Sequence, residues 1–423
     1  MPVCIPMGQT TDVLFFQKRG FAAKVMVACV FLFFCRTLPA QDLFPVLSGK
    51  ARVSVLTCGP GQELYEAFGH SAVRIQDPAL GLDLVFNYGM FSFNQENFYV
   101  NFARGYMKYT LGYTYFNDFV NEYRLAGRSV REQVLNLDSA GRQSVLAFLA
   151  HNLQPGNREY YYHYFRQNCS TKIIDLLDSA LNHRVVWRQA EWMGSTSYRA
   201  RIHDYTIHQP WGRLGIDLGL GPAIDRPITP PDLNFLPEEV EKNLSRAGLL
   251  LGGGIEVPLV SESRVLHETR VFWGGHRFGP GYIFSLLFFA ALFAFFRTGV
   301  FPAILRALEK MVFSLSALTG MVMLSVWLFT NHVDSAWNLN LLWANPLWFA
   351  LVFAPGKLSR RFPAIRRFLF FYFMGLCGLW YFLPQDLNPE LIPLVLSQAL
   401  LVTGSFRISL RQAEADPAPH PPS

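Results

Sequence analysis

The hydrophobic pattern divides the chain into a mixed N-terminal part and an apolar C-terminal part. Short apolar runs alternate with polar turns over residues 41–275, which predicts the short strands and helices of an α+β domain. Phe, Leu, Trp and Val dominate residues 278–406. We count about five candidate membrane segments there by their length, at residues 278–296, 311–330, 339–355, 368–384 and 390–406. The third and fifth are shorter and contain proline, which leaves a kinked or re-entrant path open for them.

A β-hairpin is predicted near the start of the mixed part. Ser71–Ile75 alternates apolar and polar residues, a turn follows, and Leu82–Tyr88 predicts the returning strand. If the turn is centred midway between them, paired positions sum to about 157 or 158, and His70 lies opposite Asn87 or the next residue. Asp83 shares a strand face with Asn87, because successive side chains alternate between the two faces.

The stretch Tyr160–Asp178 joins an aromatic run to an amphipathic helix, and Cys169 lies at the junction. Ser170 or Thr171 can cap the N-terminus of this helix. The partial positive charge at a helix N-terminus stabilises a thiolate and lowers the pKa of a cysteine. Cys169 is therefore the candidate nucleophile.

A cysteine nucleophile needs a base, and His70 at the head of the hairpin is our candidate. Asn87 is the first choice to orient its imidazole, and Asp83 is the second. His163 lies closer to Cys169 in sequence, but a histidine within an aromatic run is more typical of packing. Such a pair supports acyl transfer, because the thiolate attacks a carbonyl, the imidazole moves protons, and a backbone N–H at the helix start stabilises the oxyanion.

The composition favours a membrane protein. The chain is 51% hydrophobic and 15% aromatic, with only 16% charged residues. Its formal net charge is +6, but it has no basic stripe with interleaved aromatic residues, so we expect no nucleic-acid partner. No metal-binding cysteine spacing occurs, and we expect neither a metal nor a cofactor. Of the six cysteines, only Cys58 and Cys169 lie in the soluble part, where a disulfide between them is the alternative to a free nucleophile.

The first 40 residues predict a secretory signal peptide. Basic residues up to Lys24 precede the apolar run Val25–Cys35, and the small residue Ala40 precedes the expected cleavage site. The expected organisation is a signal peptide at 1–40, an external Cys/His domain at 41–240, a connection to the membrane at 241–277, a transmembrane helical domain at 278–406 and a cytoplasmic tail at 407–423.

Basic residues are distributed unevenly among the loops of the apolar part. The loops at 297–310 and 356–367 and the C-terminal tail carry ten Lys and Arg residues, whereas the loops at 331–338 and 385–389 carry none. This asymmetry places the basic loops in the cytoplasm and the domain before residue 278 outside it. The signal peptide predicts the same orientation.

The predicted outer loop after the second apolar segment is rich in polar side chains. Four of them are candidate contacts to a lipid headgroup: His332, Asn338, Asn340 and Asn345. The alternative is an ordinary loop anchored by tryptophans at the membrane surface. The aromatic run at 89–115 is likewise either core or a wall for acyl chains, and we expect Tyr88 at its edge to contact substrate.

Several short motifs, in order along the chain, resemble one protein family. They are LTCGPG (56–61), FGHSA (68–72), FNYGMF (86–91), EQVLNL (132–137), Asn157-Arg158 with Tyr160, and NCST (168–171). These motifs resemble the Lnb N-terminal periplasmic domain, and NLNLLWANPL (338–347) resembles the transmembrane domain of the same family. The cysteine motif here reads RQNCST, where the family pattern leads us to expect an acidic residue before the asparagine and alanine after the cysteine.

The resemblance implies a lipoprotein N-acyltransferase of the Lnb type found in Bacteroidota, a multi-pass protein of the bacterial inner membrane with its catalytic domain in the periplasm. The implied fold of that domain is circularly permuted papain-like (NlpC-type), similar to lecithin:retinol acyltransferase. Cys169 would be the nucleophile and His70 the base, and the resemblance does not fix a third residue. The implied substrates are a membrane phospholipid as acyl donor and a diacylated lipoprotein as acceptor, linked through a thioester in a ping-pong reaction.

Two other functions fit parts of the sequence. Related folds cleave peptide stems, so a membrane-tethered cell-wall cysteine peptidase or amidase is the first alternative. A non-enzymatic membrane scaffold with a disulfide between Cys58 and Cys169 is the second. A wall enzyme has little use for a polar-lined membrane domain, whereas two lipid substrates held in one leaflet explain why a cysteine domain is tethered there.

Overall fold

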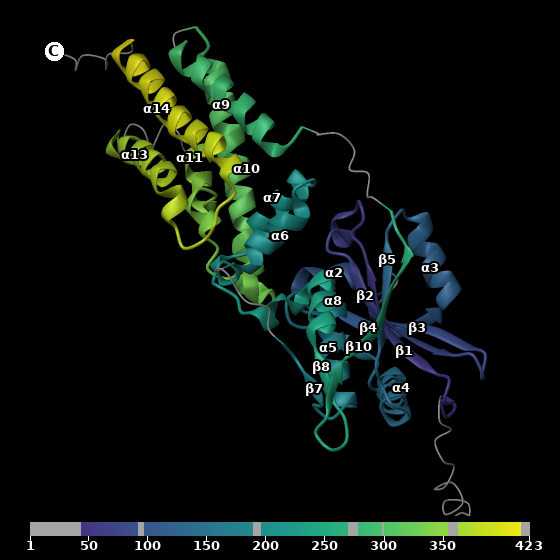
Figure 1. Ribbon diagram of the computed structural model, residues 1–423. Helices are drawn as coiled ribbons and strands as arrows, with labels where there is room; N and C mark the ends of the chain where they lie inside the picture. Colours follow the sequence, from purple (N-terminus) through teal and green to yellow (C-terminus); the bar gives the residue numbers. More distant parts are fainter. Residues whose placement is uncertain are drawn as a thin grey trace, which may run out of the picture. The chain divides into compact units, whose positions relative to one another are not determined.

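The computed structural model describes residues 44–91, 97–188, 196–269, 278–297, 300–353 and 363–415 of the chain (Figure 1). The predicted signal peptide at 1–40 lies outside the described residues. Leu47–Ser423 forms one compact unit, which contains both the mixed and the apolar part of the chain.

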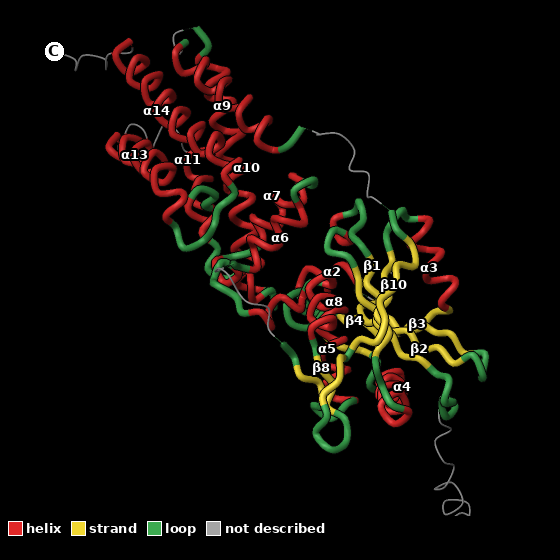
Figure 2. The backbone as a smooth tube through the Cα atoms, viewed as in Figure 1, coloured by secondary structure: helices red, strands yellow, loops and turns green. Residues whose placement is uncertain are grey.

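The mixed part folds around a seven-stranded antiparallel sheet in the order β10-β5-β1-β2-β3-β4-β6 (Figure 2). Its strands are β1 (Arg52–Cys58), β2 (His70–Asp77), β3 (Leu82–Met90), β4 (Lys108–Tyr115), β5 (Val130–Leu135), β6 (Glu159–Tyr161) and β10 (Val260–His267). Helix α3 (Phe116–Leu125) buries Phe119 against one face, beside Leu56 and Val85. Alternate strand residues point to the other face, where α4 (Ser139–Leu153) and α5 (Cys169–Ala180) pack.

The predicted hairpin is confirmed as β2 and β3, but its register differs from the prediction. Val73 pairs with Phe86, so paired positions sum to 159, and the predicted sums of 157 or 158 are wrong by one or two residues. The reason is that the loop at 78–81 is centred further along the chain than we assumed. Asp138 is the residue before α4 and is a residue type that favours the N-cap position, and its carboxylate accepts the Gly141 N–H at 2.7 Å.

The residues after α5 form a second, mostly helical lobe. Its helices are α6 (Tyr198–Thr206), α7 (Pro210–Gly219) and α8 (Pro237–Arg246), and a small sheet joins β7 (Val185–Val186), β8 (Gly248–Leu250) and β9 (Glu256–Pro258). We expected a plain connection at 241–277, but this segment supplies β8, β9 and β10. Because β10 pairs with β5, the chain adds an edge strand to the main sheet before it enters the apolar part.

The apolar part is a group of helices. They are α9 (Pro280–Phe296), α10 (Pro302–Phe329), α11 (Phe349–Phe353), α13 (Pro363–Leu379) and α14 (Ile392–Ala415), with α14 packed against α9, α10 and α13. Among the described residues, α10 alone is long and apolar enough to cross a membrane by length and composition. The segment expected at 339–355 forms two 3-10 turns and the short α11 instead of one helix. Five membrane spans therefore stay a prediction.

A buried ion pair joins α10 to α13. The Nη1 atom of Arg366 donates to Glu309 Oε1 at 2.8 Å and to the Val402 carbonyl of α14 at 3.0 Å. Both charged side chains are almost completely buried. Because an unpaired charge in this surrounding is costly, the pair favours one packing of the three helices.

We predict that Arg366→Leu destabilises the helical part by about 3–5 kcal/mol, since it leaves a buried carboxylate without its partner. The measurement is thermal unfolding of the purified protein in detergent. The double variant Glu309→Leu/Arg366→Leu is the control, and its Tm should lie above that of the single variant. A single variant as stable as the wild type would contradict this role of the pair.

Candidate active site

Asn168 fixes the start of α5 and thereby the position of Cys169. Its Oδ1 atom accepts the N–H groups of Ser170 and Thr171, each at 2.9 Å, and the Thr171 hydroxyl accepts the Asn168 N–H at 2.9 Å. This reciprocal arrangement is a capping box. Our expectation that Ser170 or Thr171 caps the helix is therefore corrected: Asn168 is the N-cap, and Cys169 is the first residue of the helix.

The Asn168 side chain also donates two hydrogen bonds. Its Nδ2 atom binds the carbonyl of Tyr164 at 2.8 Å and that of Phe235 at 2.7 Å. The residue is buried, so its amide satisfies the helix N-terminus and two carbonyls that water does not reach. Asn168 thus ties the turn before the cysteine to the second lobe.

Cys169 is a half-buried free cysteine whose surroundings favour the thiolate. Burial raises the pKa of this thiol, but the charge and the hydrogen bond of His70, the Ser71 N–H and the Ser170 hydroxyl together lower it to about 7. Cys58 is also free, and burial raises its pKa to about 12. The two cysteines are not bridged, and only Cys169 has a thiolate at neutral pH.

His70 is the first residue of β2, and the backbone turn before this strand holds it beside the thiol. Gly69 precedes it with φ +80°, and a Cβ at Gly69 would lie 2.5 Å from the Cys58 carbonyl oxygen, so only glycine fits there. Burial lowers the pKa of His70, but the charge and hydrogen bond of Cys169 and the hydrogen bond of Asn87 outweigh burial and raise it. The raised histidine pKa and the lowered cysteine pKa both favour a thiolate–imidazolium pair.

The structure brings Asn87, but not Asp83, to the imidazole. Asn87 Oδ1 lies 3.2 Å from His70 Nε2, which leaves Nδ1 as the nitrogen that faces the thiol. Asp83 lies opposite Gln76 and binds the Arg74 guanidinium twice, each time at 2.7 Å. The side chain of Asp83 is thus engaged at the far end of the hairpin, and its expected role beside His70 is corrected.

His163, the histidine nearest to Cys169 in sequence, lies on the side of the predicted outer loop. Its Nε2 atom is 3.4 Å from Asp334 Oδ2, and Arg166 Nη2 is 3.8 Å from Asp334 Oδ1. The Asp334 carbonyl also accepts the Gly221 N–H at 2.8 Å. This loop therefore contacts the turn that leads into Cys169 as well as the second lobe.

The four polar residues expected to bind a headgroup all contact other groups of the protein, and two of them are buried. Asn338 and Asn340 are buried and donate to the carbonyls of Leu218 and Asp217, at 2.7 and 2.9 Å. Asn345 accepts the Leu347 N–H, and His332 Nε2 lies 3.1 Å from the carbonyl of Phe102, in α2 (Phe98–Arg104). The expectation that Asn338 and Asn340 bind a headgroup is therefore corrected, because their side-chain amide donors already have partners within the protein.

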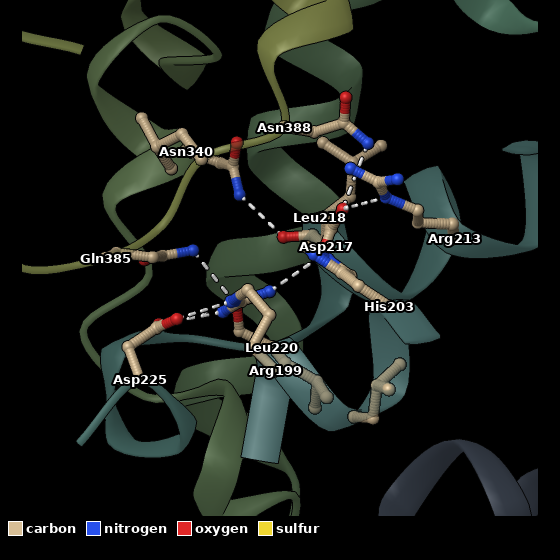
Figure 3. A network of polar contacts seen from close by, with 12 residues as sticks. Arg199, His203, Arg213, Asp217, Leu218, Leu220, Asp225, Asn340, Gln385 and Asn388 are labelled. Atoms are coloured by element: carbon tan, nitrogen blue, oxygen red, sulfur yellow. Dashed lines mark hydrogen bonds and ion pairs between the residues drawn. The ribbon is translucent and has the colours of Figure 1, made fainter. Parts of the chain in front are cut away.

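A polar network that we did not expect surrounds Arg199 (Figure 3). Arg199 is fully buried and binds the carboxylates of Asp217 at 3.0 Å and Asp225 at 2.7 Å. His203 Nε2 and Asn388 Nδ2 also bind the Asp217 carboxylate, at 2.8 and 2.9 Å. Burial raises the pKa of Asp217, but the bonds and charges of His203 and Arg199 outweigh it and lower the pKa. The network joins α6 and α7 to loops of the helical part, and no motif in the sequence signals it.

The backbone amide of Cys169 itself is the hydrogen-bond donor left for an oxyanion. The amides of Ser170 and Thr171 are occupied by the Asn168 cap. Among the described residues, the Cys169 N–H has no partner. An oxyanion formed on a carbonyl attacked by Cys169 can accept this N–H at the positive end of the helix dipole. The described residues contain no cluster of three metal-ligating side chains.

We predict that iodoacetamide alkylates Cys169 with a pH midpoint near 7, as its lowered pKa requires. Because the thiolate is the reactive form, the rate should rise through this pH and level off above it. In His70→Ala the midpoint should move up, since the imidazolium charge is lost. Peptide mass mapping provides the measurement, and unlabelled Cys58 is the internal control. A midpoint near 9.0, the ordinary pKa of a cysteine thiol, in the wild type would contradict the pairing.

We predict that Asn168→Ala lowers the free energy of unfolding by about 2–4 kcal/mol, because a cap and two buried hydrogen bonds are lost together. Asn168→Asp keeps the acceptor for the helix N–H groups but turns a buried carboxylate oxygen toward the two carbonyls, so it should also be less stable than the wild type. Thermal unfolding in detergent measures both variants. Equal stability of Asn168→Ala and the wild type would show that the cap is unimportant.

Two comparisons with family models match, and together they cover more than half of the chain. The model described as the Lnb N-terminal periplasmic domain matches residues 47–203, and the model described as the Lnb transmembrane domain matches residues 273–413. No curated protein and no solved structure matches the chain. The first match includes Cys169, His70 and Asn87. The chain therefore belongs to the Lnb family, which is associated with enzymatic lipoprotein modification, and it is a membrane protein with a periplasmic domain.

Proposed function

We propose that this protein is a lipoprotein N-acyltransferase that moves an acyl chain from a phospholipid, through a thioester on Cys169, to the α-amine of a diacylglyceryl-cysteine lipoprotein. The observation that carries the proposal is the Cys169–His70 pair, with Asn87 on the second imidazole nitrogen, in a chain of the Lnb family. The catalytic domain would face the periplasm with a circularly permuted papain-like fold. About five spans would hold it at the inner membrane.

In the first half-reaction the Cys169 thiolate attacks an ester carbonyl of the phospholipid. The carbonyl oxygen becomes an oxyanion and accepts the Cys169 N–H. As the tetrahedral intermediate collapses, the C–O bond to glycerol breaks and the His70 imidazolium gives its proton to the leaving alkoxide. The products are a lysophospholipid, a thioester on Cys169 and a neutral imidazole.

In the second half-reaction the neutral α-amine of the acceptor attacks the thioester carbonyl. His70 takes the proton that the amine loses, the C–S bond breaks, and Cys169 leaves as the thiolate. The imidazolium–thiolate pair is thereby restored. A thiolate whose pKa is lowered to about 7 is a good leaving group for an amine, and this suits the ping-pong order.

Asn87 acts as a positioning residue in this scheme. Its Oδ1 atom holds the Nε2–H of the imidazole, so that Nδ1 exchanges the proton with the sulfur and the substrate. Tyr88, expected to contact substrate, is buried, and its hydroxyl accepts a hydrogen bond from Asn152 at 2.8 Å. Tyr88 also lines a cavity between α4, α5 and the sheet.

We predict that incubation with a phospholipid labelled in its acyl chain places the label on Cys169 of the full-length protein. Intact-mass and peptide analysis should find one acyl group, and neutral hydroxylamine should remove it because it cleaves thioesters. Cys169→Ala should lose the label completely, and His70→Ala should form it at least about a hundredfold more slowly, as expected for a general acid–base group.

Cys58→Ala is the matched control, since it removes a free cysteine that the mechanism does not use, and it should be labelled like the wild type. A wild-type protein that stays unlabelled would contradict the proposal. Release of peptides from peptidoglycan stems by the same preparation would favour the cell-wall peptidase or amidase instead.

A further inference from the structure

A cavity of about 230 Å³ lies between α4, α5 and the sheet, and Lys172, in the first turn of α5 after Cys169, is one of its lining residues. Its floor is apolar and buried, with Tyr88, Leu111 and Leu176. The residues at its mouth are polar and exposed, and they include Arg158 and Asp175. The described residues that line it thus form a polar entrance above an apolar base.

The cavity adjoins Cys169 through Tyr160 and the first turn of α5. Lys172, which lines the cavity, is three residues after Cys169, and side chains at this spacing are neighbours on a helix with Cβ atoms about 5–6 Å apart. The Lys172 Nζ atom lies over the Tyr160 ring, 5.1 Å from its centroid. A Cβ at Gly89 would lie 3.7 Å from the Cys169 Cβ and 3.9 Å from the Tyr160 hydroxyl. Gly89 therefore lies between Cys169 and Tyr160, and Tyr160 lines the cavity.

The charges that line the cavity favour an anion. Arg158 and Lys172 are the cations and Asp175 is the one carboxylate among the described lining residues. Lys172 Nζ is 3.6 Å from Asp175 Oδ2, and that carboxylate is 58% exposed, so the pair is weak. Among the described residues, the Arg158 guanidinium has no carboxylate partner. One full cationic group is therefore left for a ligand.

We propose that this cavity binds the phosphodiester of the donor glycerophospholipid while Cys169 attacks its ester; the inference rests on the proposed function. A guanidinium can hold two phosphate oxygens at once, and an ammonium adds a point charge. The apolar residues at the base of the cavity would contact the carbon atoms of the lipid next to its phosphate. The phosphate and the ester carbonyl of such a lipid are separated by a few bonds of glycerol, which matches a cavity one helical turn from the nucleophile.

The test compares two acyl donors on the full-length protein. One is a short-chain phosphatidylglycerol, and the other is p-nitrophenyl octanoate, an ester without phosphate. In Arg158→Gln/Lys172→Gln the acylation rate of Cys169 by the phospholipid should fall at least about tenfold, as the loss of charge-assisted hydrogen bonds requires. The rate with the phosphate-free ester should stay within about twofold, because the thiolate–imidazolium pair is intact.

Two further variants control for charge and folding. Lys50→Gln/Arg124→Gln removes the same two charges from the same domain outside the cavity and should acylate like the wild type with both donors. Arg158→Lys/Lys172→Arg keeps the charges and should retain most of the rate with the phospholipid. An equal loss with both donors, or no loss with the phospholipid, would overturn the inference. A wild type that no phospholipid acylates would instead overturn the proposed function.

Inhibition by soluble competitors distinguishes whether the cavity binds a lipid headgroup or free phosphate. Glycerophosphoglycerol, which carries the phosphodiester alone, should slow acylation by the phospholipid in the wild type and lose this effect in Arg158→Gln/Lys172→Gln. It should leave acylation by p-nitrophenyl octanoate unchanged. Inhibition by inorganic phosphate at a lower concentration than by glycerophosphoglycerol would contradict the assignment to a lipid headgroup.

Discussion

The buried side-chain amide of Asn168 is the constraint on which the site depends. One amide group caps α5 with its oxygen and binds two carbonyls with its nitrogen, and the second of these carbonyls belongs to Phe235 in a different lobe. The cysteine that follows must then stand at the first position of the helix, where the dipole favours a thiolate. Because Asn168 occupies the next two amides, the Cys169 N–H is left for substrate. The cap of α5 and the position of Cys169 at the start of this helix are thus consequences of one residue, whereas the charge of His70 makes the largest contribution to the lowered pKa of the thiol.

The second half of the site depends on backbone geometry in the sheet. Gly69 allows the chain to turn tightly into β2, and β3 carries a register shift between Asn87 and Met90 on its β4 side. Bulged positions bend a strand and redirect its side chains, and here the bulge lies beside the thiol, where Gly89 has φ +88°. Polar contacts from the predicted outer loop to His163 and Arg166 then brace the turn that carries the nucleophile. The domain that carries Cys169 and a loop of the helical part are therefore in direct contact close to the nucleophile.

Local patterns in the sequence predicted the elements well, and contacts between distant residues poorly. The hairpin, the α4 cap and the position of Cys169 at a helix start follow from alternation and capping chemistry. Asn87 contacts His70 as predicted although the predicted β2–β3 register was wrong. The reason is that a register error of two residues leaves a side chain on the same face of the strand. The prediction that Asp83 could orient His70 was wrong because Arg74, on the neighbouring strand, donates two hydrogen bonds to its carboxylate. The sequence alone does not show this pairing. The contact of Asn388 with Asp217 and the burial of Asn338 and Asn340 likewise depend on packing between segments more than 100 residues apart.

Transfer of the acyl chain from Cys169 to an amine is the step that distinguishes an N-acyltransferase from a hydrolase. The protein is first acylated on Cys169 with labelled acyl chains and freed of phospholipid, and a diacylglyceryl-cysteine peptide is then added in a single turnover. We predict that the label leaves Cys169 and appears on the peptide as an N-acyl group, and that a peptide with a blocked α-amine does not accept it. Label that remains on Cys169, or that leaves only as free fatty acid when the free amine is present, would show that the protein is not an N-acyltransferase.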